Sequence, residues 1–450
     1  MTTVRDAKRV FVGDGSEFTG KFTWEDGRIT GQGDHAATPR DGLWGKEAFI
    51  SAPDTVITPG LVNAHHHLLQ SAFRTLPGTR HVPMRDWLGV MAAAYAKRGI
   101  DPELAYLAAR VGIAESLLNG VTTVADHHLT WPEGCDSVGI AKAVAQAARE
   151  LGIRLVFVRG SARDDPGTAA QSAADIIEAL VPSAATKPST ARTTTPGGIS
   201  ADGMVQVALG PAGVHSDSEE TFRRMAEVAA TYGVRRRTQA NEQVDVEIAA
   251  ERYGKRPLQL LEEWGWLAPD VTLAHLCGVT AQEIETLAQA GVTATHAPGC
   301  DLPMGWGVAP VGELLAAGIT VGLGTSGGGS NDAGHLLADA RLAMQVAPLA
   351  GASITARDAL QMATQGSALG LGRRDIGTLA PGAYADFCVW DTSGVHDAGV
   401  ADPVAGLLWA SPGRRPRDVY VGGKAVVKDG KLVNADEHQI VAALVERLGD

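Results

Sequence analysis

Residues 56–67 read VITPGLVNAHHH. The apolar run Val56–Ala64 is typical of a buried strand, and three consecutive histidines follow it. Because alternate residues of a strand point to the same side, His65 and His67 can share one metal ion while His66 points elsewhere. The stretch therefore indicates a buried strand with two candidate metal ligands at its carboxyl end.

Apolar runs of this kind, ending in polar or small residues, return along the chain. Most are followed by a helical pattern, such as the one in which Asp101 is expected to cap a helix, Pro102 to open it and Gly120 to end it. Strands that alternate with helices predict an α/β fold, here a (β/α)8 barrel of the TIM type. The runs are Val56–Ala64, Val121–Ala125, Ile153–Val158, Val205–Leu209, Val234–Gln239, Val271–His275, Val292–His296 and Ile319–Gly324.

Short β-like segments with turn signals lie at both ends of the 450-residue chain. Among them, Ala385–Asp391 and Val419–Val427 follow the last barrel helix. Neither end alone has enough strands to bury a face. We therefore expect residues 1–55 and 376–450 to form one small β-sandwich domain beside a barrel of residues 56–375, with two independent caps as the alternative.

The segment Pro182–Asp202 is rich in Ser, Thr, Ala and Pro and has little apolar periodicity. It follows the third predicted strand, on the side of the barrel where active sites lie. We expect a disordered excursion here, with a lid over the site as the alternative.

Composition limits the classes of partner. The chain has 39 Lys and Arg against 51 Asp and Glu, so its net charge of −12 argues against a non-specific nucleic-acid binder and an anionic membrane surface. The four cysteines lie far apart, which predicts neither a disulfide framework nor a zinc–thiolate site. No signal peptide or membrane span is evident. We expect a cytoplasmic homodimer that acts on a small neutral or cationic molecule.

Histidines end several of the predicted strands, where the functional groups of such a barrel lie. One H-x-H pair alone is weak evidence, because clustered histidines also occur on protein surfaces. Histidines at several strand ends indicate a metal site or an acid–base site far more strongly. Besides the first pair, the residues at these ends are Asp126, His127, His128, His275 and His296.

Several motifs together resemble the amidohydrolase superfamily, in particular its deaminase and s-triazine hydrolase branch. The resemblance covers essentially the whole chain, including the split β domain. The motifs are PGLVNAHHH (59–67), TTVADHH (122–128), the AH of TLAHLCG (272–278), GLGTSGGGSND (322–332) and GTLAPGAYADFCVWD (377–391).

The resemblance implies one divalent metal, zinc or iron, held by the H-x-H pair, by a histidine that ends the fifth strand and by an aspartate that ends the eighth. It also implies that a sixth-strand histidine orients the attacking water. A glutamate three residues after the fifth-strand histidine then moves protons to the substrate ring. The residues that match this pattern are His65, His67, His275 and Glu242.

Two positions depart from the pattern. Gln239 stands where the family has its fifth-strand histidine, and Ser326 stands where it has the aspartate. Triazine hydrolases resemble the second departure, since they tolerate a hydroxyl residue there. An amide oxygen is a poorer donor to a transition ion than an imidazole, so weak or absent metal is one expectation. The other is a zinc site of three histidines with an open position.

Glu242 is the only obvious carboxylate base near such an ion once the aspartate is gone, so it would serve both ends of the reaction. The alternative is a surface glutamate paired with one of the arginines in Arg235–Arg237.

Planar and polarizable side chains lie in predicted loops at the same end of the barrel, and they suit a flat heteroaromatic ring. A hydrophobic plug in the barrel mouth is the alternative for the apolar ones, and caps or turn fillers for the polar ones. The candidate substrate-binding residues are Met84, Trp87, His128, Met304, Trp306 and Asn331.

The sequence thus predicts a hydrolase that uses metal-activated water to displace an amino group or a halide from an N-heterocyclic ring. One alternative is a metal-poor or metal-free enzyme that performs hydration, ring opening or isomerisation, and another is a ligand-binding protein without turnover. The expected catalytic residues are Glu242, His275 and Ser326, and the expected metal ligands are His65, His67, Gln239 and His275.

Overall fold

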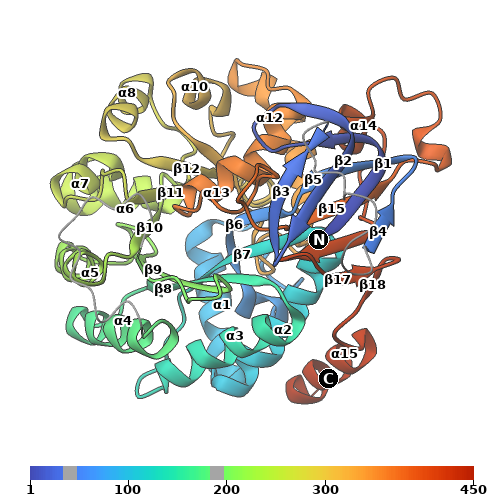
Figure 1. Ribbon diagram of the computed structural model, residues 1–450. Helices are drawn as coiled ribbons and strands as arrows, with labels where there is room; N and C mark the ends of the chain where they lie inside the picture. The colour runs from blue at the N-terminus through green and yellow to red at the C-terminus, as the bar shows by residue number, and fades with distance from the viewer. Residues whose placement is uncertain (34–47, 183–196, 450) are drawn as a thin grey trace.

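The computed structural model describes residues 1–33, 48–182 and 197–449, and their strands form two sheets (Figure 1). One sheet is the barrel wall, and the other is built from both ends of the chain. Most of the segment 182–202, expected as an excursion or a lid, lies outside the described residues. Within the described residues, no helix combines the length and the apolarity needed to span a bilayer.

The barrel wall is a parallel sheet in which each strand pairs with the next along the chain. The eighth strand is in two pieces, one paired with the seventh strand and the other with the first, so the ring is closed. The predicted (β/α)8 barrel is confirmed. Its strands are β6 (Leu61–His67), β7 (Val121–His128), β8 (Arg154–Ser161), β9 (Val205–Pro211), β10 (Arg235–Ala240), β11 (Val271–His275), β12 (Thr293–His296), β13 (Val321–Leu323) and β14 (Ser326–Gly327).

Helices surround this wall (Figure 1). In the predicted helix α2, the Asp101 carboxylate accepts a hydrogen bond from the Leu104 backbone N–H at 2.8 Å, and the helix ends before Gly120, as expected. The helices are α1 (Met84–Arg98), α2 (Pro102–Leu118), α3 (Ser137–Leu151), α4 (Pro166–Leu180), α5 (Glu219–Tyr232), α6 (Gln243–Tyr253), α7 (Pro257–Glu263), α8 (Ala281–Ala290), α9 (Pro298–Asp301), α10 (Val311–Ala316), α11 (Leu336–Val346), α12 (Ala356–Gln361), α13 (Ser367–Gly370), α14 (Pro403–Trp409) and α15 (Glu437–Leu448).

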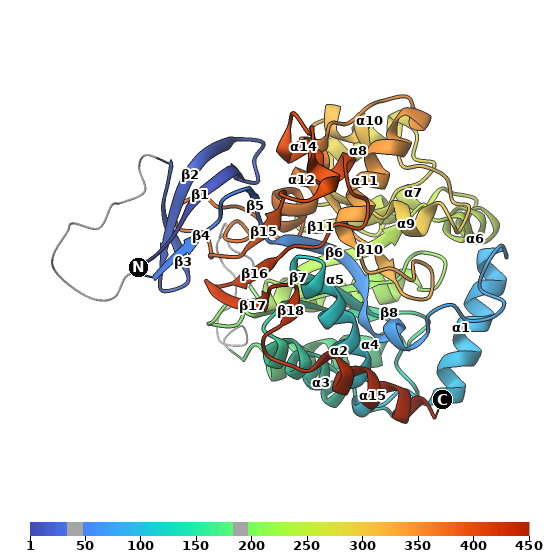
Figure 2. The same ribbon diagram turned by 90° about the vertical axis from the view of Figure 1, so that its right-hand side faces the viewer.

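The two ends of the chain join in one mixed sheet of nine strands with its own apolar core, and β1–β4 stand away from the barrel (Figure 2). The junction of the two ends is the antiparallel pair β5–β15. The strands are β1 (Thr2–Phe11), β2 (Glu17–Glu25), β3 (Arg28–Gln32), β4 (Ala48–Ser51), β5 (Thr55–Pro59), β15 (Phe387–Asp391), β16 (Asp418–Val421), β17 (Lys424–Lys428) and β18 (Lys431–Leu432).

One sequence-based expectation is wrong at Gly60: the run Val56–Ala64 is two strands in two different sheets, not one barrel strand. Pro59 has no N–H to offer a sheet at the break. At Gly60, a Cβ would lie 2.1 Å from the Thr122 hydroxyl oxygen, so only glycine allows the two segments to approach this closely. The chain thereby passes from the small sheet into the barrel within a few residues of the histidines.

The Asn63 side chain fixes the break in the eighth strand. Its Nδ2 donates to the Thr325 hydroxyl at 2.8 Å, and its Oδ1 accepts from the Thr325 backbone N–H at 3.2 Å. Because this amide joins the first and eighth strands, it holds Ser326 at the same barrel end as His65.

Candidate active site

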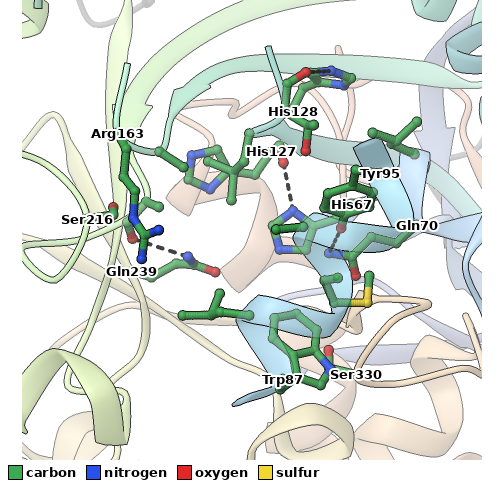
Figure 3. A pocket seen from close by; sticks show the side chains of 18 of the residues that line it. His67, Gln70, Trp87, Tyr95, His127, His128, Arg163, Ser216, Gln239 and Ser330 are labelled. Carbon is green, nitrogen blue, oxygen red and sulfur yellow. Dashed lines mark hydrogen bonds between the residues drawn. The ribbon is translucent and has the colours of Figure 1, made fainter. Parts of the chain in front are cut away.

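A cavity of about 560 Å³ opens at the carboxyl ends of the barrel strands. Its wall combines aromatic and methionine side chains with a few polar groups, which is typical of a site for a small organic ligand. Figure 3 shows Arg163, Ser216 and Gln239 on one side of this cavity and His67, Gln70 and Tyr95 on the other. Of the site residues predicted from the sequence, those that line the cavity are His67, Met84, Trp87, His128, Gln239, Glu242, Met304, Trp306 and Ser326.

The histidines of β6 alternate, as the strand requires. The rings of His65 and His67 lie on the same side, with centroids 4.9 Å apart, and the His67 Nδ1 donates to the His127 carbonyl at 2.7 Å. The His66 ring turns away and contacts the Thr325 hydroxyl at 2.9 Å. Two of the three imidazoles therefore face the site.

Gln239 joins the imidazoles of two strands. Its Oε1 lies 3.1 Å from the His65 Nε2 and 3.3 Å from the His275 Nε2. Its Nε2 donates to the Ala212 carbonyl at 3.1 Å. Because that bond uses the amide nitrogen, the amide oxygen is the atom that faces the histidines. The amide thus directs an oxygen donor to the place where the family pattern has a nitrogen donor.

The H-x-H imidazoles are electrically neutral. Burial lowers the pKa of His65 well below the usual histidine range and lowers the pKa of His67 to about 4. Neighbouring His275 lowers both values further. At neutral pH these rings therefore keep a free nitrogen lone pair, which metal ligation requires.

His275 is held in an unusual backbone conformation at the end of β11, with φ at +74°. Its Nδ1 donates to the Asp301 carboxylate at 2.6 Å, and the Trp306 ring packs edge-on against it with centroids 5.1 Å apart. Burial alone would lower the pKa of His275, but the carboxylates of Asp301 and Glu242 raise it. Strained backbone at a strand end is typical of a functional position.

Glu242 is buried, with 2% of its surface exposed, and its Oε1 lies 3.5 Å from the His275 Nε2. Its Oε2 has no hydrogen-bond partner within the described part of the chain. Burial raises the pKa of Glu242 above its usual range. The alternative of a surface glutamate paired with arginine is wrong, because Arg236 pairs with Asp270 and Arg237 bonds the Ala64 carbonyl.

These donors fit a divalent ion of the zinc type. Neutral imidazoles are preferred zinc ligands. The Gln239 amide oxygen, which is a weaker zinc ligand, points toward the imidazoles of His65 and His275. The buried Glu242 Oε2 has no hydrogen-bond partner in the described chain, and it lies here beside His275. Such unsatisfied groups are rare in proteins and indicate that the site binds something polar or charged.

A second, overlapping group of donors lies behind His275. Of the described residues, only His275, Cys300 and Asp301 form a group of His, Cys, Asp or Glu whose ligand atoms all lie within 4.8 Å of one another. Burial raises the pKa of the Cys300 thiol. This group and the donors around Gln239 share His275.

Ser326 lies at the start of β14 with φ at +55° and lines the cavity. Its hydroxyl is 3.5 Å from that of Ser330 and carries no charge toward the imidazoles. The carboxylate nearest to the ring of His275 therefore comes from Asp301 and not from the eighth strand.

The expected substrate-binding residues divide into those inside and those outside the cavity. Met84 and Trp87 lie on helix α1, not on a loop, and the Trp87 indole donates to the Gly329 carbonyl at 3.1 Å. His128 lines the cavity, but its Nε2 bonds the Thr130 carbonyl at 3.1 Å. Asn331 is not among the lining residues; its amide contacts Asp339 at 3.3 Å. The prediction that Asn331 contacts the substrate is therefore wrong for this cavity.

Sequence reasoning missed other residues of the site. His215 lines the cavity after β9, and its Nδ1 lies 3.1 Å from Asp245 and 3.9 Å from Glu242. Arg163 and Gln70 line it as well. The rule that strand ends carry function would have found His215 and Arg163, each of which follows an apolar run by a few residues.

Comparison with known proteins identifies the family to which the chain is similar. Residues 56–426 match the family model described as Amidohydrolase family. The chain is 36% identical to the 8-oxoguanine deaminase of Pseudomonas aeruginosa over 99% of its length and 97% of the relative's. It is 33% identical to an isoxanthopterin deaminase from an unknown prokaryotic organism, with 89% and 86% covered. The crystal structure of atrazine chlorohydrolase TrzN from Arthrobacter aurescens TC1, complexed with zinc, is 35% identical and superposes with a TM-score of 0.87 over 100% of both chains.

Proposed function

The chain belongs to the amidohydrolase family, and on that premise we propose that it is a metal-dependent hydrolase that replaces the amino group of an N-heterocyclic ring with the oxygen of water. Its relatives named as deaminases and the zinc complex of a chlorohydrolase support this class of reaction. Zinc is the proposed ion, with iron as the alternative.

The observation that carries the proposal is the convergence of side chains from the ends of three barrel strands beside the cavity. The Gln239 amide oxygen contacts His65 and His275, and the buried Glu242 carboxylate lies beside the same His275. The donors that would hold a divalent ion are His65, His67, Gln239 and His275, and such an ion supplies a water of lowered pKa.

The residues of this chain then bind the ring and move protons. The raised pKa of Glu242 suits a carboxyl group that accepts a proton from the attacking water and passes it to a ring nitrogen, so that the ring carbon can accept the oxygen. A second proton must reach the departing amine, and of the carboxyl groups that line the cavity, Asp126, Asp164 and Glu242, we assign both transfers to Glu242, which lies 3.5 Å from the His275 Nε2. Trp87 and Trp306 line the cavity as flat surfaces for the ring.

The substrate that we propose is a bicyclic aminated heterocycle with an oxo group, of the 8-oxoguanine class. The relative from Pseudomonas aeruginosa bears that activity in its name and aligns over nearly the whole chain. The cavity of about 560 Å³ holds a bicyclic ring, and Arg163 and Gln70 line it as polar partners for ring oxygens and nitrogens. Release of a halide from a triazine is the second candidate, supported by the TrzN structure.

The test is a screen of the zinc-loaded protein against 8-oxoguanine, isoxanthopterin and atrazine, with ammonia and chloride release as readouts. We expect ammonia from a bicyclic substrate, abolished by chelation and by Glu242→Gln. Ring opening or isomerisation of the substrate without release of ammonia or halide would contradict the proposal. Turnover that survives complete chelation would contradict it as well. A cytoplasmic location and a homodimer remain proposals as well, tested by cell fractionation and by light scattering of the purified protein.

A further inference from the structure

Asp301 is a fully buried carboxylate whose ion-pair partners are both histidines. It ends helix α9 with 0% of its surface exposed. Its Oδ1 accepts from the His275 Nδ1 at 2.6 Å, while its Oδ2 lies 3.7 Å from the His296 Nδ1 and has no hydrogen-bond partner among the described residues. Burying a charge in this way is costly unless a positive charge nearby compensates it.

The position of that compensating charge follows from the ring of His275. Because the Nδ1–H donates to Asp301, Nε2 is the ring nitrogen left to bind a cation. The Nε2 points toward the Gln239 amide oxygen at 3.3 Å. A cation held there would be separated from the Asp301 carboxylate only by the imidazole, an arrangement common behind metal-bound histidines.

The other candidate donors are not carboxylates. His65 and His67 are imidazoles, Gln239 is an amide, and Ser326 is a hydroxyl. The carboxylates beside them are Glu242, 3.5 Å from the His275 Nε2, and Asp301, on the other nitrogen of the same ring. Ser326 occupies the position where the family pattern has an aspartate, so one negative charge is missing at the eighth strand.

We propose that Asp301 supplies this missing charge from the loop after β12, acting through His275 as a positioning residue for the metal. It fixes the tautomer of His275, makes the Nε2 a stronger donor and offsets the charge of the ion. The inference rests on the proposed metal-dependent function, and it assigns the role of the missing eighth-strand carboxylate to a residue on a different element.

The test measures zinc affinity without substrate, by competition with a chromophoric chelator and by metal analysis of the purified protein. Asp301→Asn keeps an oxygen that accepts the His275 hydrogen bond and removes only the charge. We expect the zinc dissociation constant to rise about 10- to 100-fold. Adding Ser326→Asp to Asp301→Asn returns a carboxylate from the eighth strand and is expected to recover most of the affinity.

Asp339→Asn is the matched control. Asp339 is also a buried carboxylate in this region, but it accepts from the Gly299 N–H at 2.8 Å and from the Asn331 amide at 3.3 Å, with no imidazole among its partners. We expect its zinc affinity to stay within about twofold of the unmodified protein, since a carboxylate tunes a metal in this way only when it contacts one of the ligands.

Unchanged zinc affinity in Asp301→Asn would overturn the inference, and so would an equal loss in Asp339→Asn. A second zinc equivalent that disappears in Cys300→Ala would also overturn it, because His275, Cys300 and Asp301 would then bind an ion directly. These results are independent of turnover. A protein that shows the expected zinc affinities but releases no ammonia or halide would contradict the proposed function and leave the role of Asp301 intact.

Discussion

Gln239 and Glu242 are the residues on which the proposed chemistry depends. Their spacing placed both at the end of β10, and the structure brings them to the imidazoles of β6 and β11. What the sequence could not show is the direction of the Gln239 amide, which depends on the Ala212 carbonyl just after β9. Asp301 was missed for the same reason, because only packing brings α9 against His275.

Replacing Gln239 with histidine tests the ligand position. An imidazole is a stronger donor to zinc than an amide oxygen, so Gln239→His combined with Ser326→Asp is expected to tighten zinc binding by at least about tenfold. Chelator competition measures the change. If neither metal occupancy nor affinity rises, the pocket no longer has the geometry of the family site, and simple ligand loss does not explain it.

The pH dependence of the reaction reports on Glu242. The ionised carboxylate is the form that accepts the proton of water, so kcat/KM rises as pH rises through the pKa of Glu242. Burial raises that pKa, and the acid limb is therefore expected above the usual glutamate range. Glu242→Gln should lower kcat by about 10²- to 10⁴-fold and remove this limb. An acid limb that persists in the variant would assign the ionisation to another group.

Among the secondary-structure elements near the site, helix α1 is the one that the sequence analysis did not predict. Met84 and Trp87 were expected on a loop after the first strand, although Met84, Trp87, Leu88 and Met91 recur at helical spacing. One side of the helix covers the cavity, through Met84, Trp87 and Met91. The helical spacing of these residues and the alanines that follow them would have predicted the helix. The barrel strands were predictable because burial on both faces makes them continuous apolar runs.

Trp87 tests whether α1 binds the ring. Trp87→Ala removes the flat surface and its hydrogen bond to the Gly329 carbonyl, and we expect KM to rise about three- to tenfold with a smaller change in kcat. Trp87→Phe keeps an aromatic ring without the indole N–H, so its KM should lie between the KM of the unmodified protein and that of Trp87→Ala. Steady-state kinetics on the best substrate of the screen measures both. An unchanged KM in Trp87→Ala would place the ring elsewhere in the cavity.

At the scale of the whole molecule, the barrel and the composite sheet are joined by a buried ion pair. The Arg154 guanidinium of β8 donates to both oxygens of Asp386, at 2.6 and 2.9 Å, and both side chains are fully buried. Asp386 also accepts from the Gly422 N–H at 2.7 Å. The pairing of the chain ends was predictable from their strand content, but this long-range contact across 232 residues was not.

Breaking this pair should destabilise the molecule without changing its chemistry. Asp386→Asn leaves the Arg154 charge buried without its full partner, and we expect the free energy of unfolding to fall by about 3–5 kcal/mol. Denaturant titration measures it. Glu220→Gln, which alters an exposed ion pair with Arg223, is the control and should have little effect. Equal stability of the two variants would contradict a structural role for the buried pair.

The most direct test of the central claim is a zinc titration of the chelated protein, with ammonia release from the best bicyclic substrate as the readout. The account predicts no turnover without metal and a linear rise in rate that reaches its plateau at one zinc per chain. Full turnover by the chelated protein, or a rate that does not respond to zinc, would contradict it.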